Sequence, residues 1–200
     1  MTSIRHTPSP NRVADDLLLD AAMECVLAVG VRRTTLSDVA RTAGVSRMTL
    51  YRRFPDVRGM LTALITREFG KALAAATATA ANEETARGRL VTASVYMLRA
   101  LAANPLMHAV IERDGEMLLP YIMERIGTSQ RMTEEFLRAQ LAAGHADGSI
   151  RVADPTLQAR SIFLLLQPDA FTIRPSTSDL PLDDLLGELA RLLDVALAPS

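Results

Sequence analysis

The sequence predicts an all-α protein of about nine helices, and three observations support this fold class. Hydrophobic residues make up 48% of the 200 residues, whereas aromatic residues reach only 4% and tryptophan is absent. Because alanine and leucine dominate, this composition favours helices over sheets built from aromatic and β-branched side chains. Apolar residues recur three and four positions apart, and no segment alternates as a strand would. Proline and glycine separate these periodic segments, where helices tend to end.

The first two helices are bounded by local signals. A helix at Val13–Val29 has apolar residues at helical spacing and is expected to end at Gly30, since glycine readily adopts the left-handed conformation that closes many helices. A second, short helix at Leu36–Ala43 opens with the capping-box pattern T-x-x-D, which begins at Thr35. Gly44 is expected to end it.

The third and fourth helices follow directly. Ser46 is a capping residue for a helix at Arg47–Phe54, and Pro55 ends that helix because proline disfavours α geometry in the residue before it. Asp56 then caps a long helix that carries one apolar face and continues into the alanine-rich KALAAATATAAN. Five further helices are predicted at 83–103, 105–113, 129–143, 155–166 and 182–197.

Composition limits the compartment and the partner. A single cysteine, Cys25, excludes an intramolecular disulfide, which fits a reducing compartment. Residues 1–11 lack the apolar region of a signal peptide, and no apolar run approaches the about 18–20 residues of a membrane span. We therefore expect a cytoplasmic protein with a flexible N-terminal arm and no membrane partner. Residues 1–70 carry ten Arg against seven Asp and Glu, so this part is the one suited to an anion.

The two short helices around Gly44 have the proportions of a helix-turn-helix, at about 35–54. If Leu50 and Phe54 face inward, the outward face of the second helix carries polar and basic residues. These are Met48, Thr49 and Arg52, flanked by Arg47, Tyr51 and Arg53. A DNA major groove admits one such helix, whose N-terminal residues approach the base edges.

At this point the sequence from Leu19 to Leu61 resembles the DNA-binding domain of the tetracycline-repressor (TetR) family. The resemblance is carried by LDAA at 19–22, Gly30, Thr34-Thr35, Asp38-Val39-Ala40, Ala43-Gly44-Val45-Ser46, Thr49-Leu50-Tyr51 and Phe54. The family implies homodimeric repressors that leave their DNA operator when a small-molecule effector enters the C-terminal domain. It also implies a DNA-binding domain at 12–56 and a ligand-binding and dimerisation domain at 57–200.

The resemblance also assigns candidate DNA contacts. Thr35 and Tyr51 match phosphate-contacting residues, while Arg47, Met48, Thr49 and Arg53 lie where bases are read. The lysine that is usual at the start of the fourth helix is replaced by Val57, with Arg58 beside it as the substitute phosphate contact. The full set is Thr35, Ser46, Arg47, Met48, Thr49, Tyr51, Arg52, Arg53 and Arg58.

The second domain offers two further sets of candidates. Methionine and aromatic residues would suit a pocket for a largely apolar ligand. The pocket candidates are Tyr96, Met97, Met117, Tyr121 and Phe163. The last two helices have broad leucine faces and by position resemble the family's dimerisation pair. The dimer-interface candidates are Ile162, Leu166, Leu185, Leu189 and Leu192.

Two alternatives remain open from sequence. An all-α enzyme or carrier would use the C-terminal cavity, but no titratable groups occur at a recognisable catalytic spacing. A non-specific nucleoid binder would bind every duplex alike, with salt-sensitive affinity. The three histidines are too scattered to predict a metal site, and no cofactor motif is present.

Overall fold

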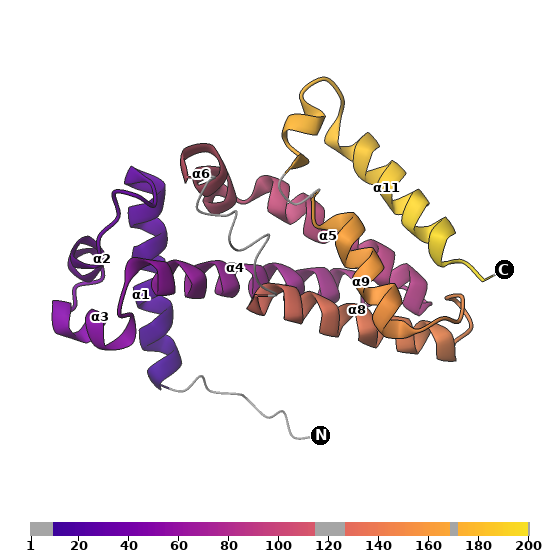
Figure 1. The fold of residues 1–200 in the computed structure, drawn as a ribbon, viewed down its shortest axis with the longest axis horizontal. Coiled ribbons are helices and arrows are strands. Elements are labelled where there is room, and N and C mark those ends of the chain that lie inside the picture. The colour runs from indigo at the N-terminus through magenta and orange to yellow at the C-terminus, as the bar shows by residue number, and fades with distance from the viewer. Residues whose placement is uncertain (1–9, 115–126, 169–171, 200) are drawn as a thin grey trace. The chain divides into compact units, whose positions relative to one another are not determined.

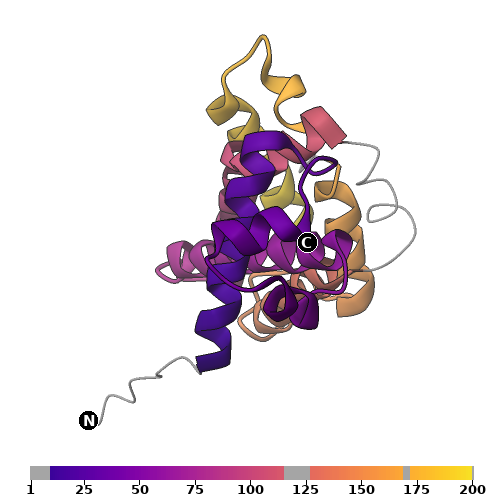
Figure 2. The same cartoon turned by 90° about the vertical axis from the view of Figure 1, so that its left-hand side faces the viewer.

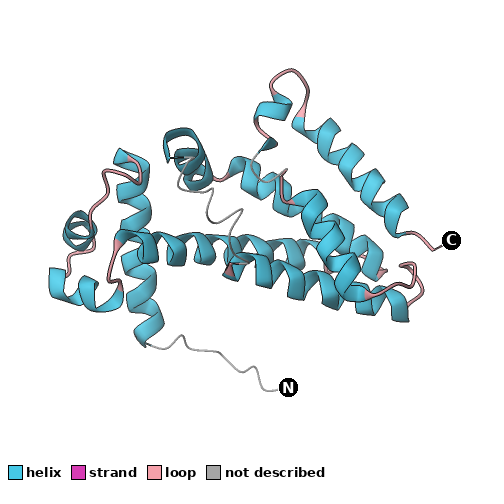
Figure 3. Ribbon diagram, in the orientation of Figure 1, coloured by secondary structure: helices cyan, strands magenta, loops and turns pink. Residues whose placement is uncertain are grey.

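The computed structural model describes residues 10–114, 127–168 and 172–199 of the chain (Figure 1). Within these residues it contains nine α-helices, one 3-10 turn and no strand, so the all-α prediction is confirmed (Figure 3). The described residues form two compact units: 10–67 with 108–114, and 68–107 with 127–168 and 172–199.

The first unit contains α1 (Pro10–Val29), α2 (Leu36–Thr42), α3 (Arg47–Arg53) and the beginning of α4 (Val57–Ala80). Figure 2 looks onto this unit, with α1 in indigo. Both predicted glycine ends are confirmed. Gly30 has a φ of 84° and Gly44 a φ of 67°, in the left-handed region that disfavours other residues.

The core of this unit explains why the short helices are stable. Val26, Val39, Leu50, Met60 and Leu64 are each 1% exposed or less. A seven-residue helix is marginal by itself, so this burial, rather than helix propensity, supplies most of the stability of α2 and α3.

Ion pairs join α4 to α1 within the first unit. Arg67, on α4, approaches Asp20 of α1 at 2.8 Å and Asp16 of α1 at 3.6 Å. Arg67 is only 12% exposed, whereas the two acids lie near the surface. The division between the units therefore falls after Arg67, inside α4.

The second unit contains the rest of α4, α5 (Ala86–Ala103), α8 (Thr128–Ala146), α9 (Pro155–Leu166), the 3-10 turn η2 (Pro175–Thr177) and α11 (Leu182–Leu197). Helix α6 (Pro105–Asp114) begins in the second unit and ends in the first. α5 packs against both α8 and α11, and α8 packs against α9. The buried core that these helices form with Ile150, from the segment between α8 and α9, also contains Leu90, Leu137, Leu141, Ala159, Ile162, Leu193 and Leu197.

Several helix limits differ from the predicted ones by one to three residues, and those of α5 and α8 are examples. α5 begins at Ala86 rather than Glu83, because the Thr85 side chain accepts the N–H of Gly88 at 3.1 Å and so caps the helix. α8 runs three residues past Ala143 and ends at Ala146. The turn η2 was not predicted, since its sequence contains a proline and two hydroxyl residues that read as a break.

Of the described helices, none alone has both the length and the apolar character needed to cross a membrane. α5 and the first part of α6 meet these requirements only when joined, and they are bent by 59° at their junction.

Candidate DNA-binding site

The turn between α2 and α3 is held by short-range hydrogen bonds. The Asp38 N–H donates to Thr35 Oγ1 at 3.1 Å, so Thr35 caps the helix as predicted. Asp38 Oδ2 accepts the Thr35 hydroxyl at 2.6 Å instead of the Thr35 backbone N–H that a full capping box requires. After Gly44 reverses the chain, the N–H of Val45 donates to the carbonyl of Ala40 at 2.9 Å. The entry into α3 is therefore fixed by atoms close in sequence.

The start of α3 is capped as predicted. Ser46 Oγ accepts the N–H of Thr49 at 3.1 Å, and the two hydroxyls lie 2.9 Å apart. Leu50 is 0% exposed and Phe54 is 7% exposed, so α3 docks through these two side chains. The other face of the helix is consequently left to solvent.

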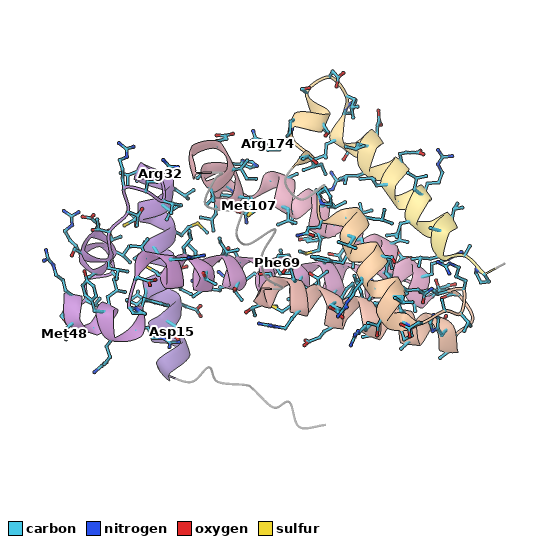
Figure 4. The ribbon with its side chains drawn as sticks, in the orientation of Figure 1. Asp15, Arg32, Met48, Phe69, Met107 and Arg174 are labelled. Carbon is cyan, nitrogen blue, oxygen red and sulfur yellow. The ribbon has the colours of Figure 1, made fainter. Side chains whose placement is uncertain are left out.

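That exposed face carries the predicted recognition residues. Met48 is 78% exposed and stands out from the ribbon of α3, while Tyr51 is 48% exposed (Figure 4). Arg47, Thr49 and Arg52 are also exposed. A rigid helix with arginine donors, one apolar side chain and one phenol can contact both phosphates and base edges of a duplex.

Arg53 differs from the other residues of this face. Its Nε donates to Oδ1 of Asp15, on α1, and its Nη2 donates to Oδ2 of the same carboxylate, both at 2.5 Å. The Cζ atom of Arg53 lies 5.7 Å from the ring centroid of Phe54. The hydrogen bond and the charge of Asp15 raise the pKa of Arg53 above its usual value. Sequence reasoning missed Asp15, because no local pattern links two residues 38 positions apart.

Arg58 lies on the surface at the beginning of α4, whereas its neighbour Val57 is half-buried. Asp56 Oδ1 accepts the N–H of Gly59 at 2.6 Å, which confirms the predicted cap. The assignment of Arg58 as the phosphate contact that replaces the family lysine stays a prediction.

The pocket candidates are described only in part. Tyr96 and Met97 are half-buried against Ala76, Ala80 and Ala93. Phe163 is half-buried against the main core of the second unit. Met117 and Tyr121 lie outside the described residues, so the pocket stays a prediction.

The dimer candidates are divided between core and surface. Ile162 is 5% exposed and belongs to the core, and Leu166, Leu185 and Leu189 are half-buried against a cluster around Leu98. Leu192 alone among them is largely exposed. The exposed apolar residues of α9 and α11 are Leu157, Leu164, Leu165, Leu192 and Val195. The spacing i, i+7, i+8 places Leu157, Leu164 and Leu165 on one side of α9, but it does not tell whether that side is buried or exposed.

Comparison with known proteins agrees with this arrangement. Residues 18–64 match the family described as "Bacterial regulatory proteins, tetR family", and residues 83–167 match "Tetracyclin repressor-like, C-terminal domain". An HTH-type transcriptional regulator of Mycobacterium tuberculosis, itself uncharacterized, is 35% identical over 150 residues, which are 75% of this chain and 76% of that protein. The chain belongs to the TetR family. This TetR-family protein is accordingly a DNA-binding transcriptional regulator rather than an enzyme.

Solved structures share the fold of this TetR-family chain. The fatty acid degradation regulator FadR from Bacillus halodurans superposes with a TM-score of 0.66 at 20% identity, covering 94% of this chain and 96% of that one. FadR from Bacillus subtilis, solved in complex with stearoyl-CoA, gives a TM-score of 0.65 at 19% identity, covering 91% and 98%. At these identities the similarity concerns the fold.

Proposed function

We propose that this TetR-family regulator is a homodimeric repressor that binds a two-fold DNA operator through α3 and releases it when a small, largely apolar ligand enters the second unit. The observation that carries the proposal is the exposed face of α3. It presents Arg47, Met48 and Tyr51 to solvent while Leu50 holds the helix to the core. Because the reading helix would act on cellular DNA, the protein would work in the cytoplasm.

Dimerisation is supported by the exposed leucines of α9 and α11. Leu164 and Leu165 are 66% and 69% exposed, and Val195 is 70% exposed. Large contiguous patches of exposed apolar side chains mark protein interaction sites. A second copy of this chain would cover them, since a two-fold dimer places the same surface of each protomer against the other. The two recognition helices of the dimer, one α3 from each protomer, would then be separated by one DNA turn, about 34–36 Å, or by a multiple of it.

The ligand class rests on side-chain chemistry. Tyr96, Met97 and Phe163 are half-buried and could line a cavity for an apolar chain, because methionine adapts its shape to such ligands. The stearoyl-CoA complex of Bacillus subtilis FadR suggests long-chain acyl-CoA as the first compound to test.

Helix α4 is the element through which the ligand would act. It is one helix from Val57 to Ala80 that contributes its beginning to the DNA-binding unit and its remainder to the second unit. A displacement at its far end would therefore change the position of the reading helices. A coupling of about 1–3 kcal/mol between ligand and operator alters affinity roughly 5–150-fold.

The test starts with selection of a preferred duplex from a random library, followed by fluorescence anisotropy at several salt concentrations. The proposal expects a sequence preference, a two-fold symmetric site and two protomers per site. Tyr51→Phe should weaken preferred and scrambled duplexes by the same factor, and stearoyl-CoA should raise the Kd of the operator, with coenzyme A alone as control. Equal affinity for every duplex would instead favour a non-specific nucleoid binder.

A further inference from the structure

Asp15 forms an ion pair with Arg53, a residue of the proposed DNA-contacting face, and so limits the orientations of its side chain. Arg53 is one helical turn after Thr49, on the same face of α3. Its side chain is 56% exposed, yet both Nε and Nη2 donate to the carboxylate of Asp15 at 2.5 Å. The ring of Phe54 packs beneath the guanidinium at 5.7 Å, so Arg53 is oriented from two sides.

The pairing uses only one edge of the guanidinium. This planar group has five N–H donors, and Asp15 takes the edge formed by Nε and Nη2. One Nη1 hydrogen and the outer Nη2 hydrogen form a second edge outside this pair. An edge of two parallel donors matches two neighbouring acceptors, such as O6 and N7 of guanine.

Contacts other than this pair also hold α3 in place. The helix already docks through Leu50 and Phe54, which are 0% and 7% exposed, and Ser46 caps its beginning. An exposed ion pair adds little to folding stability. The negative charge of a carboxylate beside a DNA-binding surface repels phosphates and weakens binding. A role in recognition would explain why a carboxylate occupies this position.

The carboxylate changes what Arg53 contributes to binding. An unpaired arginine is attracted to any phosphate regardless of sequence. Paired with Asp15, the guanidinium stays protonated and keeps its directional donors, but the ion pair as a whole carries little net charge. It also loses less side-chain freedom on binding, because its orientation is set beforehand.

We propose that Asp15 is a specificity-determining residue, which orients the outer edge of Arg53 for a pair of base acceptors and withholds its charge from phosphates. This inference rests on the proposed operator binding by α3. Asp15 acts through Arg53 and does not itself contact the operator.

The experiment compares Asp15→Asn with Glu24→Gln, which removes the same charge from another exposed position of α1. The Kd is measured for the selected operator and for a scrambled duplex over a range of salt concentrations. Asp15→Asn should tighten binding to the scrambled duplex and steepen its log–log salt slope by up to about 0.9. The specificity ratio, which is the Kd of the scrambled duplex divided by the Kd of the operator, should fall roughly 2- to 12-fold. Glu24→Gln should leave the ratio unchanged.

Arg53→Lys tests the pair from its other side, and serves if Asp15→Asn folds poorly. Lysine keeps the charge but lacks the planar two-edged fork, so the ratio should fall while binding to the scrambled duplex is retained. In an Arg53→Ala background, Asp15→Asn should have no further effect on the ratio.

Other results would contradict either the proposed operator binding or the role of Asp15, and the two cases can be told apart. Wild-type protein without any sequence preference overturns the proposed operator binding and this inference with it. If wild-type protein has a preference but Asp15→Asn leaves the ratio unchanged, the inference alone is wrong. A lower melting temperature with an unchanged ratio identifies the pair as a structural contact only.

Discussion

Two exposed helix faces of this protein differ in chemistry. The outer face of α3 carries arginines, a phenol and one methionine, whereas α9 and α11 expose Leu157, Leu164 and Val195. Charged side chains are stable in water without a partner, but clustered leucines are not, since each exposed apolar surface costs free energy. The first face is therefore suited to a polyanion that binds reversibly, and the second to another protein surface that stays covered.

Salt concentration should affect binding through the two faces differently. Binding to DNA releases counterions, so operator affinity should fall steeply as salt rises. Association through leucine side chains depends on burial of apolar surface and should be insensitive to the same change or slightly strengthened. Sedimentation and anisotropy over one salt series would measure both in the same samples.

The largest effect is expected when the apolar face is disrupted. Leu164→Glu places a charge among the exposed leucines, so the dimer should dissociate, and operator affinity should fall on the order of 10²–10⁴-fold with the loss of the second reading helix. Val152→Glu is the matched control, because Val152 is 81% exposed and lies outside α9 and α11. Analytical ultracentrifugation at micromolar concentration is the measurement. A Leu164→Glu protein that remains dimeric would exclude this face as the interface.

The next effect distinguishes the inner and outer faces of α3. Leu50→Ala removes a fully buried side chain and should cost about 2–5 kcal/mol of unfolding free energy. Met48→Ala, at a position 78% exposed, should change stability by about 0.5 kcal/mol or less but alter operator affinity. Urea denaturation followed by circular dichroism measures the first, and anisotropy the second. Equal loss of stability in both variants would contradict the docking of α3 described here.

A smaller effect is expected on the pH dependence of stability, which should differ between Asp147 in the second unit and the Ser46 cap in the first. Asp147 Oδ2 accepts the N–H of Ala86 and Oδ1 that of Ser149, both at 2.9 Å. The pKa of Asp147 is lowered, first by a hydrogen bond with the Ser149 side chain and then by these two backbone hydrogen bonds. A lowered pKa in the folded state means that the stabilisation is present above the unfolded value, near 3.9, and is lost as pH falls through the folded value. Asp147→Asn should therefore destabilise at pH 7 and make progressively less difference below about pH 4.

The matched cap in the first unit should not respond to pH in this way. Ser46→Ala removes a hydroxyl cap, which should cost about 0.5–2 kcal/mol at both pH values because a hydroxyl does not titrate there. Thermal unfolding at pH 7 and pH 3.5 measures both variants. A pH-independent cost for Asp147→Asn would show that the carboxylate charge does not matter to this contact.

The smallest effect concerns α4. A Cβ added at Gly70 would lie 3.3 Å from Cε of Met132, the flexible end of a side chain that can move aside. Gly70→Ala should therefore stabilise α4 by about 1 kcal/mol. It should also change the ratio of operator affinities with and without stearoyl-CoA more than the affinity without it. An unchanged ratio would remove Gly70 from the switching mechanism.

The helix limits of the first unit were largely predictable because the signals that set them are local. Thr35 and Asp38 are three residues apart, as are Ser46 and Thr49, and Gly30 and Gly44 act through their own backbone conformation. Apolar spacing likewise identified Leu50 and Phe54 as the inner face of α3. The outward residues followed from that assignment, and the resemblance to the TetR family supplied their expected roles.

The leucine faces of α9 and α11 were not resolved by the same reasoning. Both helices carry leucine on more than one side, so periodicity alone could not tell that Ile162 belongs to the core while Leu164 and Leu165 reach the surface. That division depends on where α5 and α8 pack, because α5 covers one side of α11 and α8 one side of α9.

The sequence by itself determined the all-α class, the helix-turn-helix and the exposed face of α3, since caps, glycine turns and apolar spacing act within about four residues. Only the tertiary structure decided that Arg53 is held by Asp15, that Arg67 ties α4 to α1, and which leucines remain exposed. These features depend on side chains brought together from distant positions, and an ion pair needs only one acid within reach, which many residues of the sequence could have supplied.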